Sequence, residues 1–201
     1  MVASKVSAVS SVPDRKDRRS RMKQVIIMQG LSGSGKSHWV DMNYPDHPNV
    51  VSADRFFLYT DEAPLEYNFR PELLGKAHAF CMNNFIRMLE IPFPATGDGS
   101  GITPTIIVDN TNTERWEWKN YVKLAEHFGY EWAVVDMYDG ALTNEELSDR
   151  NEHGVPLEVI ERQRERYEHA NSEELLSYSQ HKGVDPTAVY RRNNDKPKGK
   201  Q

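Results

Sequence analysis

The feature that most constrains the fold of this chain is one glycine- and serine-rich stretch, Gly30-Leu31-Ser32-Gly33-Ser34-Gly35-Lys36-Ser37. It follows the apolar run 25–28 and precedes a segment, 38–42, that is compatible with a helix. A strand, a loop with the G-x-x-x-x-G-K-[ST] spacing and a helix, in this order, are the context of a phosphate-binding P-loop. Backbone N–H groups of such a loop surround an anion, while Lys36 reaches the β/γ-phosphates and Ser37 offers its hydroxyl to Mg²⁺. We therefore predict ATP and Mg²⁺ as cofactors, with residues 30–37 as the binding loop.

Composition narrows the class of protein. The 201 residues fit one domain, and 38% of them are hydrophobic without an apolar run of membrane-spanning length, so we expect no membrane partner. The amino terminus lacks the apolar segment of a secretory signal, and the single cysteine, Cys81, cannot form a disulfide within the chain. We expect a cytoplasmic, intracellular protein with Cys81 as a small buried helix residue. These features leave the oligomeric state open.

Charge is distributed unevenly along the chain. Of 25 basic and 30 acidic residues, seven basic and two acidic lie in 1–24, and six basic and two acidic lie in 181–201. The middle therefore holds 12 basic and 26 acidic residues, a net charge of -14. We predict a flexible basic arm at 1–22, a domain at 23–180 and a flexible basic tail at 181–201. Solvated tails are the simpler interpretation, and a weak electrostatic hold on nucleic acid is the alternative.

Four segments are predicted as strands. Two of them, 23–29 and 105–109, contain the apolar run of a strand that is buried in a parallel sheet. Segment 50–52 is a short strand, and 131–138 alternates and then runs apolar. The Pro- and Gly-rich segment 91–103 is predicted as a loop. Ligands of open α/β sheets bind beyond the carboxyl ends of the strands, so Asp54 and Asp109, which follow or end two of these segments, are expected beside the P-loop. Asp109 is placed to hold Mg²⁺, usually through water. Asp54 is predicted as the general base that takes the proton of an acceptor hydroxyl, the alternative being a turn or capping residue. Asn110 and Thr111 are expected either to bind the acceptor or to lock the turn.

Two segments have the apolar spacing of helices with one buried face, 71–90 and 114–128. Leu74 is expected on the buried face of the first. Trp116 and Trp118 of the second are expected to pack in the core rather than to stack on bases.

A capping box, Thr143-x-x-Glu146, predicts the start of a further short helix that carries Arg150. A break at 153–156 separates it from a second helix, 157–169. Two short arginine-bearing helices resemble a lid that brings a guanidinium, that of Arg150, onto the transferred phosphoryl group. A solvated charged helix is the alternative, and it is favoured for most arginines of the second helix. The fold class predicted is α/β, a three-layer P-loop NTPase kinase fold with a short parallel sheet flanked by helices and a helical lid.

A series of short motifs in a fixed order resembles the P-loop kinase domain of the NEDD4-binding-protein-2-like family, and more distantly the T4-type polynucleotide 5'-kinase domain. The resemblance covers about residues 24–170. Its motifs are the P-loop, Val51-Ser52-Ala53-Asp54, Ala77-His78, Val108-Asp109-Asn110-Thr111-Asn112, Gly129-Tyr130 and Arg150-Asn151-Glu152-His153-Gly154-Val155-Pro156. The resemblance implies ATP with Mg²⁺, a lid arginine, Asp54 as general base and acceptor-phosphate contacts near Thr111. The polynucleotide kinases carry an Asp directly after the base and an Arg two residues later, where this chain has Arg55 and Phe57. Arg55 is therefore a candidate acceptor residue that approaches from a different direction.

Two classes of function agree with these features. The first is an ATP-dependent phosphotransferase acting on a hydroxyl, with a nucleic-acid 5'-OH end as the favoured acceptor and a small molecule as a variant. The second is an ATP-binding or ATPase module that regulates partner contacts. Asp54 favours the first class, because a binding switch needs no base directed at an acceptor. The acidic middle of the chain counts against a long polynucleotide track.

Overall fold

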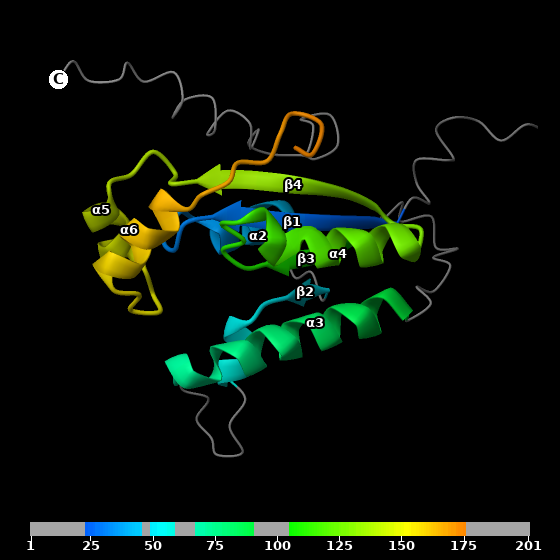
Figure 1. Cartoon of the computed structure of the whole chain (residues 1–201), viewed down its shortest axis with the longest axis horizontal. Helices are drawn as coiled ribbons and strands as arrows, with labels where there is room; N and C mark the ends of the chain where they lie inside the picture. Colours follow the sequence, from blue (N-terminus) through cyan, green and yellow to red (C-terminus); the bar gives the residue numbers. More distant parts are fainter. Residues whose placement is uncertain (1–22, 46–48, 59–66, 91–104, 176–201) are drawn as a thin grey trace, which may run out of the picture.

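The computed structural model describes residues 23–45, 49–58, 67–90 and 105–175, and every element labelled in Figure 1 lies within these ranges. The predicted arms at 1–22 and 181–201 and the predicted loop at 91–103 lie outside them. No helix in the described ranges is long and apolar enough to cross a membrane.

The centre of the molecule is a parallel sheet of four strands, β1 (Gln24–Gly30), β2 (Val50–Val51), β3 (Thr105–Asp109) and β4 (Glu131–Tyr138), in the order β2-β3-β1-β4. The register pairs Met28 of β1 with Asp109 of β3 and with Val135 of β4. The predicted parallel sheet is confirmed, and β3 and β4 have the predicted bounds. Because β1 is central, the loop that follows it begins in the middle of the carboxyl edge of the sheet.

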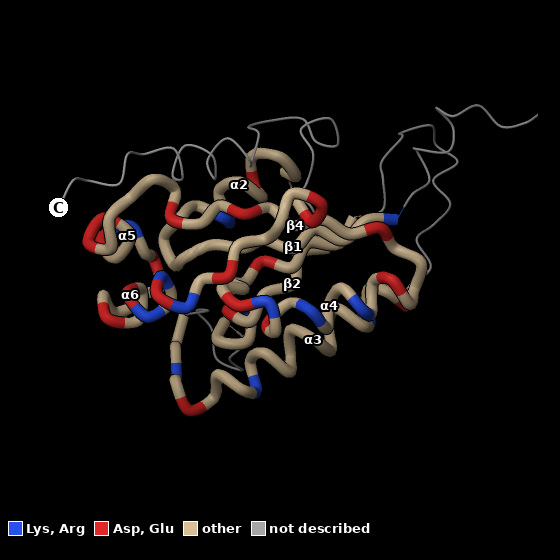
Figure 2. The backbone as a smooth tube through the Cα atoms, turned by 45° about the horizontal axis from the view of Figure 1, so that its top comes forward, with Lys and Arg blue, Asp and Glu red and all other residues tan. Residues whose placement is uncertain are grey.

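Five α-helices surround this sheet in the described part of the chain: α2 (Lys36–Asn43), α3 (Leu74–Glu90), α4 (Arg115–His127), α5 (Asn144–Arg150) and α6 (Leu157–Glu165), with 3₁₀ turns η1 (Asp54–Leu58) and η2 (Pro71–Leu73). Alternate residues of β1 face opposite layers. Val25 and Ile27 belong to a core cluster with α3 and α4, whereas Ile26 and Met28 pack with α2. Figure 2 shows α2 on one side of the sheet and α3 and α4 on the other, and Figure 1 shows α5 and α6 side by side at the carboxyl end of the sheet. The predicted three-layer α/β fold is confirmed.

Two burial predictions are wrong. Trp116 is 66% exposed, while Trp118 is 3% exposed. Residues two apart on a helix point to nearly opposite sides, so both tryptophans cannot face one core. Leu74 is 42% exposed, because the buried series of α3 (Ala77, Cys81, Phe85, Leu89) repeats every four residues and extends back to Leu73 instead.

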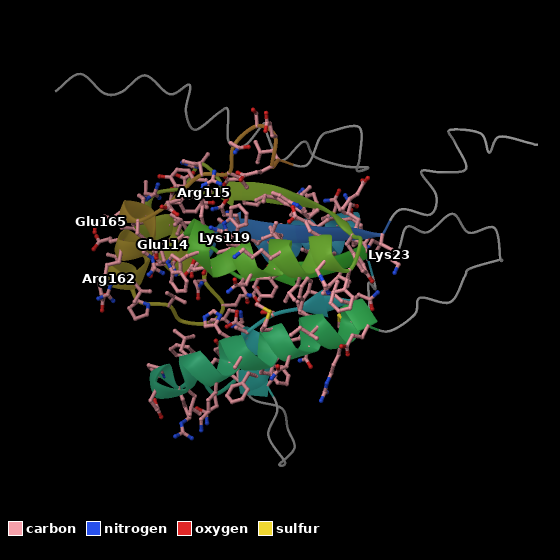
Figure 3. The ribbon with its side chains drawn as sticks, turned by 45° about the vertical axis from the view of Figure 1, so that its right-hand side comes forward. Lys23, Glu114, Arg115, Lys119, Arg162 and Glu165 are labelled. Atoms are coloured by element: carbon pink, nitrogen blue, oxygen red, sulfur yellow. The ribbon has the colours of Figure 1, made fainter. Side chains whose placement is uncertain are left out.

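The last helix is shorter than the predicted 157–169. It ends at Glu165, and Arg166 is its C-cap. Beyond it, the N–H of Glu168 donates to the carbonyl of Thr113 at 2.8 Å. This bond ties the chain to the start of α4, so the helix cannot continue through Glu168. Figure 3 shows Glu114, at the start of α4, near α6, and Arg166 lies 3.3 Å from the Glu114 carboxylate.

Candidate functional site

The P-loop has the backbone that its glycines predict. Gly33 and Gly35 have φ angles of +79° and +96°, which L-residues with a Cβ rarely adopt. A Cβ at Gly33 would overlap the carbonyl oxygen of Leu147, so α5 packs directly on the loop. The buried Ser34 hydroxyl has no hydrogen-bond partner among the described residues. An unsatisfied polar atom inside a loop of this shape fits a site that is completed by phosphate oxygens.

Lys36 is buried at the first position of α2. Its ammonium group donates to the carbonyls of Gly30 (3.0 Å) and Leu31 (2.8 Å). Since an ammonium group has three N–H bonds, one remains for a phosphate oxygen. Burial lowers the pKa of Lys36 from 10.5 to about 8, and the nearby charges of Asp109 and Asp54 oppose this by stabilising the protonated form. The charged form of this amine is therefore less favoured than that of an exposed lysine, and a bound anion would favour it.

Ser37 and Asp109 form a pair of oxygen ligands beside this lysine. The Ser37 hydroxyl donates to Asp109 Oδ2 at 2.8 Å, which joins α2 to the end of β3. Burial raises the pKa of Asp109, while Lys36 and the Ser37 hydrogen bond lower it. A hydroxyl and a carboxylate at this spacing fit a hard cation such as Mg²⁺, which would supply positive charge to the phosphate oxygens.

Asp54 lies at the start of η1, separated from the end of β2 by Ser52 and Ala53, and its side chain is 48% exposed. Its carboxylate accepts a hydrogen bond from Tyr67 Oη at 3.1 Å and lies 3.7 Å from His153 Nε2. The carboxylate is close enough to Lys36 to influence the pKa of that amine. The structure therefore brings together Lys36, Asp109 and Asp54, three residues from three parts of the chain.

The turn after β3 is held by its own side chains. Asn110 is buried: its Oδ1 accepts from the N–H of Ala53 at 2.8 Å, and its Nδ2 donates to Cys81 Sγ at 3.5 Å. Thr111 accepts a hydrogen bond from the N–H of Gly30 through its carbonyl, at 2.9 Å. Asn110 was predicted either to bind the acceptor or to lock the turn, and its hydrogen bonds favour the second role. The Asn110 hydrogen bond also fixes the backbone directly before Asp54.

Arg55 and Arg150 are exposed side chains for which the described part of the chain provides no hydrogen bond or ion pair. Arg150, the last residue of α5, has Nη2 4.0 Å from the point where a Cβ at Gly35 would lie, so its guanidinium is beside the P-loop. Arg164 is different. Its guanidinium is bonded to Asn144, Asp139 and the Leu142 carbonyl, so it braces α6 against the start of α5.

The α5–α6 pair packs on the P-loop. Leu31 of the loop forms a small core with Leu147 and Ile160. Gln163, which is 7% exposed, accepts from the N–H of Ser32 at 3.0 Å and donates to the Ser32 hydroxyl at 3.2 Å. Sequence reasoning missed Gln163, although its position three residues after Ile160, on the apolar face of α6, was a usable signal. The contacts of Tyr67 and His153 with Asp54 were also missed: no motif includes Tyr67, and the motif that includes His153 does not indicate which residue it contacts.

Comparisons with known proteins agree with this geometry. A family described as an AAA domain matches residues 99–170. Human NEDD4-binding protein 2 is 32% identical over 148 residues, which is 72% of this chain and 8% of that protein. YLP motif-containing protein 1 of rat is 25% identical over 187 residues, 82% of this chain and 12% of that protein. The chain thus matches about a tenth of the length of these curated relatives.

The sheet order, the P-loop and the Ser37–Asp109 pair define a P-loop nucleotide-binding domain of the kinase-like and NTPase-like class. Within this class, the domain is of the NEDD4-binding-protein-2-like family, as the order of its motifs predicted.

Proposed function

We propose that this domain is an ATP-dependent phosphotransferase that moves the γ-phosphate of ATP to a hydroxyl, with a nucleic-acid 5'-OH end as the acceptor. The observation that carries the proposal is the position of Asp54. Its carboxylate is half exposed and lies near Lys36 and Asp109, on the edge of the nucleotide site. A nucleotide switch does not require such a group, whereas a kinase needs it to receive the acceptor proton.

The residues of the chain divide the reaction between them. Asp54 takes the proton of the acceptor hydroxyl as the oxygen forms its bond to the γ-phosphorus. The bond from that phosphorus to the β,γ-bridging oxygen breaks, and its electron pair leaves with ADP. Lys36 binds the β/γ-phosphates, and Arg150 stabilises the charge on the transferred group. The Gly30–Ser37 loop orients the phosphates, and Ser37 with Asp109 would hold Mg²⁺.

Charge favours a short acceptor contact over a long one. Figure 2 shows acidic residues interspersed with basic residues on α4 and α6. In α6, for example, Arg162 and Arg164 lie among Glu158, Glu161 and Glu165. A long track along a polynucleotide requires Lys and Arg without such neighbours. The terminal nucleotide is therefore the part of the acceptor that we expect the domain to hold, with Arg55 and Thr111 as candidate contacts.

One labelling experiment tests the proposal. The protein is incubated with Mg²⁺ and γ-³²P-ATP together with 5'-OH oligonucleotides, nucleosides or sugars, and 5'-phosphorylated oligonucleotides are the blocked control. We expect label on the 5'-OH oligonucleotide and none on the blocked one. Label on a nucleoside or sugar alone would redirect the proposal to a small-molecule kinase. ATP hydrolysis without label on any acceptor would replace it with the regulatory ATPase class.

A further inference from the structure

Asp54 is contacted by two side chains that the nucleotide site does not use. Tyr67, which precedes α3, donates its hydroxyl to Asp54 Oδ1 at 3.1 Å. His153, from the connection between α5 and α6, has Nε2 3.7 Å from Asp54 Oδ2. The Tyr67 and His153 rings lie against each other with centroids 4.4 Å apart. Two aromatic side chains that pack on each other thus lie beside the two oxygens of the Asp54 carboxylate, Tyr67 beside Oδ1 and His153 beside Oδ2.

Tyr67 is suited to hold a carboxylate because it remains a hydrogen-bond donor. Burial raises the pKa of Tyr67 above its usual value, and the charge of Asp54 and the hydrogen bond to it raise the pKa further. The ring packs edge-on against the buried Phe57 (centroids 6.0 Å apart) and is stacked on Phe69 (6.5 Å, 10° between planes). Two aromatic neighbours therefore hold the Tyr67 ring in place, and with it the position of the hydroxyl oxygen.

His153 is held by the turn that ends α5. The Asn151 side chain, through Oδ1, accepts from the N–H groups of His153 (2.9 Å) and Val155 (3.1 Å). The helices on either side of this turn are tied to the P-loop, α6 through Gln163 and Ser32, and α5 through Leu147 and Gly33. His153 therefore has its position set by the phosphate-binding loop. At 3.7 Å its contact with Asp54 is longer than a hydrogen bond, so its main contact is the packing on Tyr67.

We propose that Tyr67 and His153 are positioning residues for Asp54: Tyr67 fixes the direction of the carboxylate, and His153 holds the Tyr67 ring in register with the P-loop. This inference rests on the proposed function, because a direction matters only if Asp54 receives a proton. Neither side chain is assigned contact with ATP or with the reacting atoms. These contacts connect η1 to the α5–α6 connection. They would therefore fix the position of Asp54, which follows β2, relative to the phosphates bound by the loop that follows β1.

The test compares Tyr67→Phe, His153→Ala and His153→Gln with wild type in single-turnover transfer from γ-³²P-ATP to a 5'-OH oligonucleotide. Tyr67→Phe keeps the ring and removes only the O–H. Tyr130→Phe is the matched control, because it removes a buried hydroxyl that has no partner among the described residues. The KM for ATP and ATP hydrolysis without acceptor are measured for every variant, and circular dichroism verifies folding. Each change is also made in an Asp54→Asn background.

We expect Tyr67→Phe to lower the transfer rate about 10- to 150-fold, the loss typical of one hydrogen bond to a charged group, with the KM for ATP and hydrolysis within twofold of wild type. His153→Ala should lower the transfer rate in the same way, and His153→Gln should not restore it, because the amide lacks the ring that packs on Tyr67. In the Asp54→Asn background the same changes should have less than a twofold effect, since residues that act through one group are not additive.

Three results would overturn the inference. Wild-type transfer rates in Tyr67→Phe and in both His153 variants would exclude positioning while leaving the proposed function intact. An equal loss in the Asp54→Asn background would show a general structural effect that does not pass through Asp54. Absence of transfer by the wild-type protein to any acceptor would overturn the proposed function, and this inference with it.

Discussion

At the scale of single residues, the nucleotide site depends on a lysine held in conditions that disfavour its charge. Lys36 is 9% exposed, and its ammonium group is bonded to two carbonyls of the loop that it follows. Burial lowers its pKa to about 8. A bound phosphate anion raises this pKa again, because it stabilises the protonated amine. The sign of this effect gives a prediction about pH.

We predict that ATP affinity decreases as pH rises above about 8, the pKa of Lys36 in the nucleotide-free protein. Above that pH the amine is neutral and must take up a proton to bind phosphate, so each further pH unit lowers affinity by up to about tenfold. Isothermal titration calorimetry with Mg²⁺-ATP between pH 7 and pH 9 measures this. Lys36→Ala should bind ATP weakly at pH 7, turn it over far more slowly than wild type and lose the pH dependence. The same affinity at pH 7 and pH 9 in wild type would contradict this role of Lys36.

Arg150 is predicted to act in the transition state. Its guanidinium lies beside Gly35, and the described residues engage it in no hydrogen bond or ion pair. Arg150→Ala should lower kcat by at least about 10²-fold with the KM for ATP within about threefold, because arginines that meet developing phosphoryl charge contribute about 10³–10⁵ in rate elsewhere. Arg150→Lys should recover little, since it lacks the planar fork.

The matched control for Arg150 is Arg162→Ala, which removes an exposed arginine of α6. Steady-state phosphotransfer kinetics should show no change in that variant. A raised KM with unchanged kcat in Arg150→Ala would remove Arg150 from the transition state. Arg164, the next arginine that the sequence offers, is bonded to Asp139, Asn144 and Leu142, so its replacement is expected to affect stability first.

At the scale of elements, the α5–α6 pair packs on the P-loop and also includes Arg150. The predicted capping box forms: the N–H of Glu146 donates to Thr143 Oγ1 at 3.2 Å, and the N–H of Thr143 donates to Glu146 Oε2 at 2.8 Å. That cap fixes where α5 begins, and the Leu31–Leu147–Ile160 core and the Gln163–Ser32 bonds fix where the pair lies. The cap could be predicted from four consecutive residues. The packing of the α5–α6 pair on the P-loop could not be predicted, since it depends on contacts between residues far apart in the chain.

The packing of α5 on the P-loop predicts a difference in stability between two glycine substitutions. Gly33→Ala introduces a Cβ that overlaps the Leu147 carbonyl at a φ of +79°, whereas Gly129→Ala has a φ of +72° and no atom within 4 Å. Both variants bear the cost of positive φ, about 1–2 kcal/mol. Gly33→Ala adds the displacement of α5, about 1–3 kcal/mol. Urea denaturation should show this larger loss of unfolding free energy for Gly33→Ala, and equal losses would contradict the close packing of α5 on the loop.

At the scale of the whole molecule, the parallel sheet and its order of elements could be predicted because the fold repeats simple signals. Apolar runs such as 105–109 and 131–138 are buried on both faces, and the P-loop spacing predicts the turn and the helix that come after β1. Trp116 shows the limit of this reasoning, because apolar composition alone does not say which face of a helix is buried. The same limit applies to the site. Lys36, Ser37 and Asp109 are marked by local motifs, whereas Tyr67, His153 and Gln163 are defined only by the folded chain.

The central claim is that Asp54 makes this nucleotide-binding domain a phosphotransferase, and Asp54→Asn tests it most directly. The amide keeps the shape of the side chain but cannot take the acceptor proton, and loss of a general base typically costs about 10²–10⁴-fold. Transfer of ³²P from γ-³²P-ATP to a 5'-OH oligonucleotide is measured beside ATP affinity for wild type and Asp54→Asn. We predict labelled oligonucleotide with wild type, a loss of that size with Asp54→Asn, and ATP affinities within about twofold of each other. Transfer by Asp54→Asn at the wild-type rate would contradict the account and leave Asp54 as a structural residue of the turn after β2.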